Sequence, residues 1–413
     1  MERKIFLNTF YQIFGKVVIS FLGLVGTSFL TRYLGPIGFS EYSFIFAFVG
    51  FAYIFMDFGL GTLLTRTLAS QKEGERLFSE FFSLRVLLSV IVLFFSMLIV
   101  IFLPYTTEIK IGIFIASFST IFILFSGVFW GLFQAEIKFS KMVIPQIITS
   151  VCSFLLISLG VIFRANLFYF LLISVAASLV GLFISFLFSK YKKLFIFNFK
   201  VFWRIIIKAL PFGIGLITSV AYFKVDILIL SFFYNPSFYP DVGLYSLSYK
   251  VFEVAVIFGG LFSQTLFPLF SRIINSKVFL IHFKKYLLYS LLISFSAILV
   301  LLFFANFFIS ILGGSKFLQS AQSLRILSLA AGSSILAGFF SSVAIAGHKE
   351  VLILKFSIIA LILNVFLNFV FIPQFSFIAA SWTTVVTQSF IMTTNIFASY
   401  LVIKQHLRMI KAP

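Results

Sequence analysis

Apolar runs long enough to cross a bilayer occupy most of this chain. A hydrocarbon core requires about 20 mostly apolar residues per helix. Such runs lie near residues 10–30, 42–63, 81–103, 111–133, 143–163, 167–188, 210–233, 243–267, 286–309, 324–346, 351–372 and 377–401. The pattern therefore predicts an all-α polytopic membrane protein with about twelve transmembrane helices.

The composition supports the same class of protein. Hydrophobic residues make up 61% of the 413 positions and charged residues only 10%, with a mean hydropathy of +1.16. A soluble domain of this composition would lack the polar surface that keeps it in water. Arg3 and Lys4 precede the first apolar run, as in a signal peptide, but the run continues to about residue 30 and no small-residue cleavage site closes it. We interpret this run as the first transmembrane helix.

Basic residues give the chain an orientation. The net charge of +19 would suit a nucleic-acid partner, but the lysines and arginines lie in the short gaps between apolar runs. An even number of helices places both termini on one side, and the gaps on that side hold about 22 basic residues. The opposite gaps hold four, namely Arg32, Lys110, Arg164 and Lys316. This bias predicts cytoplasmic termini and no nucleic-acid partner.

The longest polar gap divides the chain almost in half. It covers residues 189–209, is strongly basic and is predicted to be a cytoplasmic linker. Six predicted helices precede it (1–188) and six follow it (210–413), and "GPIGFSEYSFIFAF" in the first half is echoed by "DVGLYSLSYKVFE" in the second. We expect two six-helix lobes around a central cavity, a common plan for transporters.

Sequence signatures of enzymes are missing. The chain has no GxxxxGK[ST] phosphate loop, no HExxH motif and a single cysteine, Cys152. The gaps on the outer side are short, and their few acidic residues are scattered. A membrane glycosyltransferase or ligase would need clustered acids or histidines in an ordered loop. We therefore expect no enzyme, cofactor or metal, and transport is the class that remains.

A set of loose motifs, in order along the whole chain, resembles a known family. They are "FLTRYLGPIGFSEYSF" (29–44), "MDFGLGTLLTRTLAS" (56–70), "YFKVDILILSFF" (222–233), "VGLYSLSYKVFE" (242–253), "SLRILSL" (323–329), "IAGHKE" (345–350), "LNVFLNFVFIP" (363–373) and "FIAASWTTVVT" (377–387). Together they resemble the polysaccharide-transporter branch of the multidrug/oligosaccharidyl-lipid/polysaccharide exporter superfamily, which includes the O-antigen flippases.

The resemblance implies a function. Such a protein is expected in the bacterial cytoplasmic (inner) membrane, where it moves an undecaprenyl-pyrophosphate-linked oligosaccharide from the inner to the outer leaflet by alternating access. Membrane lipids, a glycan polymerase or a chain-length protein are the implied partners, and coupling to H⁺ or Na⁺ through Asp226 or Glu253 stays open. The alternative is an ion-coupled drug or cation antiporter of the same superfamily.

Charged residues inside the apolar runs are the candidate site residues. Such charges face the bundle interior or a wet cavity, because they are costly in lipid. The candidates for substrate binding are Lys16, Lys224, Lys250 and Arg325, with Arg32 at the outer mouth. The candidates for coupling or charge pairing are Asp57, Asp226 and Glu253. Leaving Arg32 aside, four bases against three acids favour an anionic substrate. Arg85 is expected to reach the surface from its helix end.

Several of these residues have structural alternatives. Lys250 and Glu253 are three positions apart and therefore lie on one helix face. They either neutralise each other or bind the substrate. Asp57 is expected to pair with a lysine across the bundle. Arg32 either anchors a helix end or contacts substrate.

In the run 210–233, Lys224 and Asp226 are two positions apart and point about 160° away from each other on a helix. One hypothesis places Lys224 in the cavity and pairs Asp226 with a base on a neighbouring helix, Lys250 being the first candidate. In the other, both are structural. Asn364 and Asn368 share one helix face and are expected to form interhelical hydrogen bonds.

Overall fold

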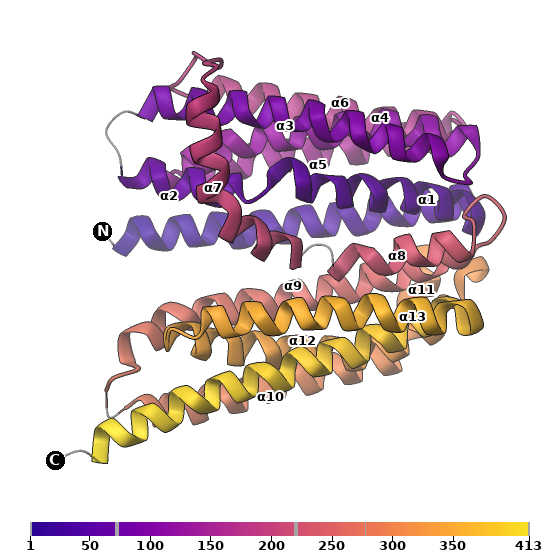
Figure 1. Ribbon diagram of the computed structural model, residues 1–413. Coiled ribbons are helices and arrows are strands. Elements are labelled where there is room, and N and C mark those ends of the chain that lie inside the picture. The colour runs from indigo at the N-terminus through magenta and orange to yellow at the C-terminus, as the bar shows by residue number, and fades with distance from the viewer. Residues whose placement is uncertain (1, 71–73, 219–221, 277, 412–413) are drawn as a thin grey trace. The chain divides into compact units, whose positions relative to one another are not determined.

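The computed structural model describes residues 2–70, 74–218, 222–276 and 278–411 and is built of helices (Figure 1). In chain order the helices are α1 (Glu2–Asp57), α2 (Leu60–Ser70), α3 (Gly74–Phe102), α4 (Thr107–Ala135), α5 (Phe139–Ile162), α6 (Leu167–Phe188), α7 (Phe199–Leu216), α8 (Tyr222–Phe233), α9 (Asp241–Ile273), α10 (Phe279–Phe303), α11 (Ala305–Gly313), the 3₁₀ turn η2 (Ser315–Phe317), α12 (Ser320–Ala346) and α13 (Glu350–Lys411).

Within the described residues, nine helices are long and apolar enough to cross a membrane. Two of them, α1 and α13, bend in the middle, and each half has the length of a span, so that these nine helices account for eleven spans. Large apolar side chains such as Phe94, Phe102 and Phe183 are exposed along them. The predicted class, an all-α polytopic membrane protein, is confirmed.

The bend in α1 follows from two residues. Gly35 has φ 68° and ψ −178°, a conformation that only glycine adopts without strain. Pro36 follows, and the missing N–H of a proline costs little at the first position of a helix. The first two predicted spans are therefore two segments of α1 that meet at Gly35.

The bend in α13 lies at Ser376, whose φ is 49°. A positive φ strains a residue that carries a Cβ. The Ser376 hydroxyl donates a hydrogen bond to Oδ1 of Asp241 in the first turn of α9, and this bond helps to offset that strain. The gap that hydropathy predicts between residues 372 and 377 coincides with this bend.

One predicted span does not form a single helix. The run 210–233 contains two separate helices, α7 and α8, and α7 begins at Phe199, within the segment predicted as a linker. Pro211 lies well inside α7. Hydropathy missed the start of α7 because Lys200, Arg204 and Lys208 lower the average, although their spacing of four puts them on one helix face.

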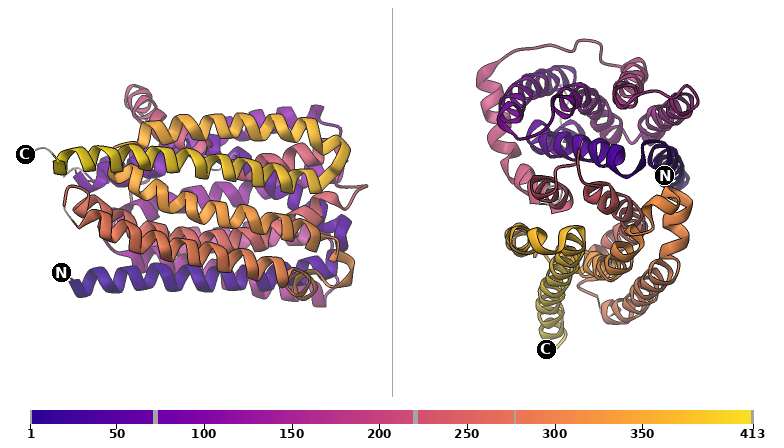
Figure 2. Two further views of the ribbon diagram at one scale, coloured as in Figure 1. Left: turned by 90° about the horizontal axis from the view of Figure 1, so that it is seen from below. Right: turned by 90° about the vertical axis from the view of Figure 1, so that its right-hand side faces the viewer.

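The chain divides into two compact units, here called unit 1 (Met1–Leu228 with Asn235–Phe238) and unit 2 (Ile229–Tyr234 with Tyr239–Pro413). In unit 1, α4 packs against α1, α2, α3 and α6, and α5 packs against α1 and α6. A cluster rich in phenylalanine, including Phe78, Phe82, Phe129 and Phe133, fills the space between α3 and α4. The right-hand view of Figure 2 shows the long helices of unit 1 nearly end-on.

In unit 2, α12 is the central helix and packs against α9, α10 and α13. Its sequence is rich in alanine, serine and glycine, and small side chains let neighbouring helices approach closely. Hydroxyl groups add hydrogen bonds across these contacts, as between Ser323 and Ser381 (2.6 Å) and between Ser342 and the carbonyl of Ser263 (2.9 Å). Close packing of the helices and hydrogen bonds between them therefore stabilise unit 2.

The positive-inside bias leads to a prediction about topology. In a protein with Cys152 replaced by serine, we expect single cysteines at Lys110 or Lys316 to react with a membrane-impermeant maleimide added outside the cell. Cysteines at Lys192 or Lys284 should react only after permeabilisation. Lys192, Lys284 and Lys316 are exposed and Lys110 is half-buried, so that none of the four positions is closed to the reagent by burial and the comparison tests sidedness. The opposite labelling pattern would reverse the assigned orientation.

Candidate functional site

A buried ion pair joins three helices of unit 1. Asp57 ends α1, and its Oδ1 accepts a hydrogen bond from Nη2 of Arg85 on α3. Nη1 of Arg85 also donates to the carbonyl oxygen of Leu124 on α4, at 2.9 Å. The Arg85 side chain is 2% exposed and the Asp57 side chain 10%. Because both charges are removed from solvent, each depends on the other for its stability.

The backbone after Asp57 fixes the position of its carboxylate. Phe58 and Gly59 have φ values of 43° and 74°, which ends α1, and Gly59 N donates to Oδ2 of Asp57 at 3.2 Å. A Cβ at Gly59 would lie 2.5 Å from the backbone nitrogen of Gly213 on α7, so that a larger residue would push α7 away. The end of α1 at Phe58 and Gly59 therefore positions both the Asp57 carboxylate and α7.

The sequence-based expectation for Arg85 is wrong. α3 begins at Gly74 rather than near residue 81, and Arg85 lies about 16 Å along the helix from its start. At this depth the side chain is buried in the bundle and does not snorkel to the membrane surface. The partner of Asp57 is thus an arginine, where a lysine was expected.

Lys224 and Asp226 lie on α8 and differ in burial. Asp226 is 1% exposed, whereas Lys224 is half-buried. Residues two apart on a helix point to different sides. The stem of Lys224 passes Gly50 of α1, where a Cβ would lie 3.7 Å from the Cε atom. Gly50 is about 22 Å beyond the Gly35 bend, so that Lys224 is held within the depth of the hydrocarbon core.

Lys250 and Glu253 form an ion pair on α9. Nζ of Lys250 lies 3.1 Å from Oε2 of Glu253, and the two side chains are 42% and 36% exposed. They lie about 14 Å and 18 Å along α9 from its first residue. Partly exposed charges at such a depth require water beside them rather than lipid. The pairing expected from their spacing is present, and a substrate role for either residue stays a prediction.

The remaining predicted site residues, Lys16, Arg32 and Arg325, are all exposed. Their roles toward a substrate stay predictions, as do those of Lys224 and Asp226. The hypothesis that Asp226 pairs with Lys250 also stays a prediction, and Lys250 bonds to Glu253 in this structure.

A polar network lies inside α13 on both sides of its bend. Nδ2 of Asn368 donates to Oδ1 of Asn364 at 3.0 Å, and the Thr383 hydroxyl donates to Oδ1 of Asn368 at 2.6 Å. Both asparagines are fully buried. The expected interhelical hydrogen bond is therefore confirmed, because Asn368 and Thr383 belong to different halves of α13.

Beside this network runs an apolar groove of about 430 Å³. Its lining is Leu367, Phe371, Phe375, Ile378, Ala379, Trp382, Thr383 and Val386. Thr383 is the polar member, and its hydroxyl is engaged by Asn368 and by the carbonyl of Ala380. The groove therefore suits hydrocarbon better than it suits a sugar.

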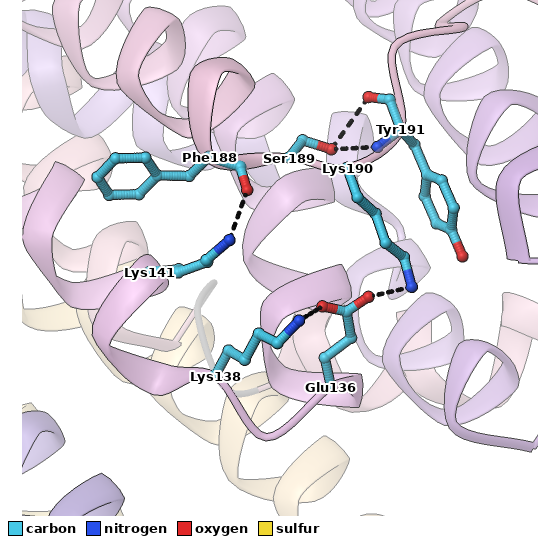
Figure 3. Close-up of polar contacts among 7 residues, drawn as sticks. All are labelled: Glu136, Lys138, Lys141, Phe188, Ser189, Lys190 and Tyr191. Atoms are coloured by element: carbon cyan, nitrogen blue, oxygen red, sulfur yellow. Dashed lines mark hydrogen bonds and ion pairs between the residues drawn. The ribbon is translucent and has the colours of Figure 1, made fainter.

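Glu136 follows the last residue of α4 and lies among lysines at one end of unit 1 (Figure 3). Its carboxylate bonds to Lys190 and, at 2.9 Å, to Lys138. Burial raises the pKa of Glu136, but the hydrogen bonds and charges of both lysines outweigh this and hold the pKa below its ordinary value. The hydrogen bond to Glu136 in turn raises the pKa of Lys190. The cluster is therefore charged at neutral pH.

Among the described residues, no group of three or more His, Cys, Asp or Glu side chains is arranged to hold a metal ion. The charged groups described above are ion pairs and a cluster of lysines around Glu136. Such groups can bind and release anions.

The fold is that of transporters of the multidrug/oligosaccharidyl-lipid/polysaccharide exporter superfamily. The lipid II flippase MurJ, in an inward closed conformation, superimposes with a TM-score of 0.78 at 19% identity, over 98% of this chain and 90% of that chain. An inward-facing multidrug resistance MATE transporter gives a TM-score of 0.70 at 11% identity, over 95% and 96% of the two chains.

The family follows from the sequence. The family model described as "polysaccharide biosynthesis protein" matches residues 5–274, and the chain belongs to this family. A Pyrococcus furiosus transporter of the same superfamily, noted for the reverse polarity of its binding pocket, gives a TM-score of 0.60 at 13% identity, over 99% of this chain and 96% of that chain. Among curated protein sequences, none matches the chain.

Proposed function

We propose that this protein is a flippase for an undecaprenyl-pyrophosphate-linked oligosaccharide, an O-antigen repeat unit or a similar glycan. It moves this substrate from the inner to the outer leaflet of the bacterial cytoplasmic membrane by alternating access. Membership of the polysaccharide biosynthesis family supports a glycan substrate. The likeness to a lipid II flippase supports a lipid-linked form of that glycan.

The excess of basic charge at membrane depth carries the proposal. Arg85 neutralises Asp57 inside the bundle, so that this carboxylate is not available to a substrate. The charges that remain are Lys16, Lys224, Lys250 and Arg325 against Asp226 and Glu253. Four bases against two acids favour a pyrophosphate over a cation. Lysine suits this role because its ammonium binds phosphate as a compact point charge.

Burial and contacts support the roles that we propose for these residues. Lys224, held against Gly50, contacts the pyrophosphate-sugar head group, and Lys250 contacts it when its bond to Glu253 opens. Lys16, Arg325 and, at the outer mouth, Arg32 add to the basic surface. Asp226 or Glu253 is the group through which an H⁺ or Na⁺ gradient would drive the cycle. A glycan polymerase or chain-length protein would receive the product.

The rival function is export of cationic drugs in exchange for an ion. The likeness to MATE transporters is compatible with this function, since the fold is shared. A cation would require a surplus of carboxylates among the intramembrane charges, and the surplus here is basic. We therefore favour the flippase.

Reconstitution in vesicles tests both functions. Purified protein with a lipid-linked pyrophosphate oligosaccharide should make the sugar accessible to a lectin on the far side without ATP, because the sequence has no nucleotide loop. Collapse of the ion gradient should stop the reaction. Cationic dyes should not be exported under the same conditions. A need for ATP, or dye export without lipid movement, would contradict the proposal.

A further inference from the structure

The basic segment 189–198, here called the strap, is fixed to unit 1. The Ser79 hydroxyl on α3 donates to the carbonyl of Lys193 at 2.6 Å, and Ile196 N donates to the Ser83 hydroxyl at 2.9 Å. Figure 3 shows Lys190 held by Glu136, and Lys141 of α5 donates to the carbonyl of Phe188 at 3.1 Å. The lysines of the strap therefore occupy defined positions next to the helix ends.

α7 continues from the strap and runs in another direction than its neighbours. In Figure 1 it crosses the direction of α3–α6, and in the right-hand view of Figure 2 it is seen from the side where those helices are seen nearly end-on. It packs against α2 and α3 of the same unit. Since the long helices cross the bilayer, α7 lies roughly along the membrane surface.

The sequence of α7 divides its surface into three faces. The face packed against unit 1 carries Phe202, Ile205 and Ala209. The exposed apolar stripe carries Phe199, Trp203, Ile207 and Leu210, of which Phe199 is 73% and Trp203 67% exposed. The third face is basic and carries Lys200, Arg204 and Lys208, all exposed. The apolar and basic stripes adjoin each other along the helix.

These faces match a helix that lies in the boundary between hydrocarbon and headgroups. The exposed apolar stripe continues the lipid-facing surface of the spanning helices, and the basic stripe meets the headgroups. Between residues 190 and 208 the sequence contains six basic residues and no acid, so that its charge is complementary to an anionic surface. We propose that α7 and the strap form a surface that binds the headgroups of anionic phospholipids.

Trp203 provides the probe for this surface. The chain has three tryptophans, and the variant W130F/W382F leaves Trp203 as the single fluorophore. This protein is reconstituted with phospholipids brominated near the glycerol, either phosphatidylglycerol or phosphatidylcholine at the same mole fraction. We expect phosphatidylglycerol to quench Trp203 about twofold more strongly, because each basic residue attracts anionic lipid. Bromines near the end of the acyl chain should quench less in both lipids.

The basic stripe can then be removed. K200Q/R204Q/K208Q in the same background should abolish the preference for phosphatidylglycerol. The matched control K284Q/K285Q/K404Q removes three exposed lysines outside α7 and should retain it. If the first variant does not fold, salt supplies the same test on the parent protein, since screening should reduce the preference.

Three outcomes would overturn the proposal. Equal quenching by the two headgroups would remove the anionic preference. Loss of the preference on adding inorganic phosphate, but not chloride of equal ionic strength, would indicate a site for free phosphate. Absence of quenching by either lipid at either depth would show that protein covers this face.

Discussion

Arg85→Ala should remove most of the folded protein from the membrane. The substitution leaves the Asp57 carboxylate buried without its counter-ion and frees the carbonyl of Leu124. Breaking a buried ion pair from one side costs about 3–5 kcal/mol. Whole domains are stable by only about 5–15 kcal/mol, so that this loss is large. The amount of protein in membranes and its melting temperature in detergent would measure the effect.

The same helix supplies a control for this prediction. Arg76 on α3 also forms an ion pair, with Glu80 at 3.1 Å, but its side chain is 63% exposed. The Glu80 side chain is 7% exposed, but water solvates the Arg76 guanidinium, so that Arg76→Ala should cost less than Arg85→Ala. The double variant D57N/R85Q should be more stable than R85Q alone, since it leaves no buried charge unpaired. An Arg85→Ala protein with normal abundance and melting temperature would contradict the structural role of the pair.

The fold could be predicted to a large extent from the apolar runs, because lipid requires every spanning segment to be apolar and helical. The bends at Gly35 and Ser376 coincide with gaps that hydropathy already marks. α7 was missed because an in-plane helix places charges and apolar groups on different faces, and a running average cancels them. The periodicity of Lys200, Arg204 and Lys208 was the signal that could have revealed it.

The candidate site was less predictable than the fold. The spacing of Lys250 and Glu253 predicted their pairing, since residues three apart on a helix are neighbours. The partner of Asp57 lies on another helix, 28 positions away in sequence. Spacing carries no information about such a contact. Arg85 was misjudged because the polar first turns of α3 hide where that helix begins.

Lys224→Ala should abolish most of the flipping activity while the protein remains folded. Lys224 is half-buried at membrane depth, and we propose that its ammonium contacts the pyrophosphate of the substrate. A hydrogen bond to a charged group contributes about 1.5–3 kcal/mol, so that the initial rate should fall about tenfold or more. Lys224→Arg should retain part of the activity, because it keeps the positive charge but replaces the compact ammonium by a planar guanidinium. Lys224→Glu should be inactive.

The vesicle assay with lipid-linked oligosaccharide measures these rates, and the amount of reconstituted protein is determined in parallel. Lys110→Ala is the matched control, because it removes a lysine near the start of α4 whose hydrogen-bond partner among the described residues is the backbone carbonyl of Ile101, at 2.9 Å. Its rate should equal that of the unchanged protein.

Gly50 offers a second approach: Gly50→Leu should displace the stem of Lys224 and slow flipping, whereas Gly50→Ala, with its Cβ at ordinary contact distance, should be tolerated. Full activity of Lys224→Ala would exclude the proposed contact with the substrate.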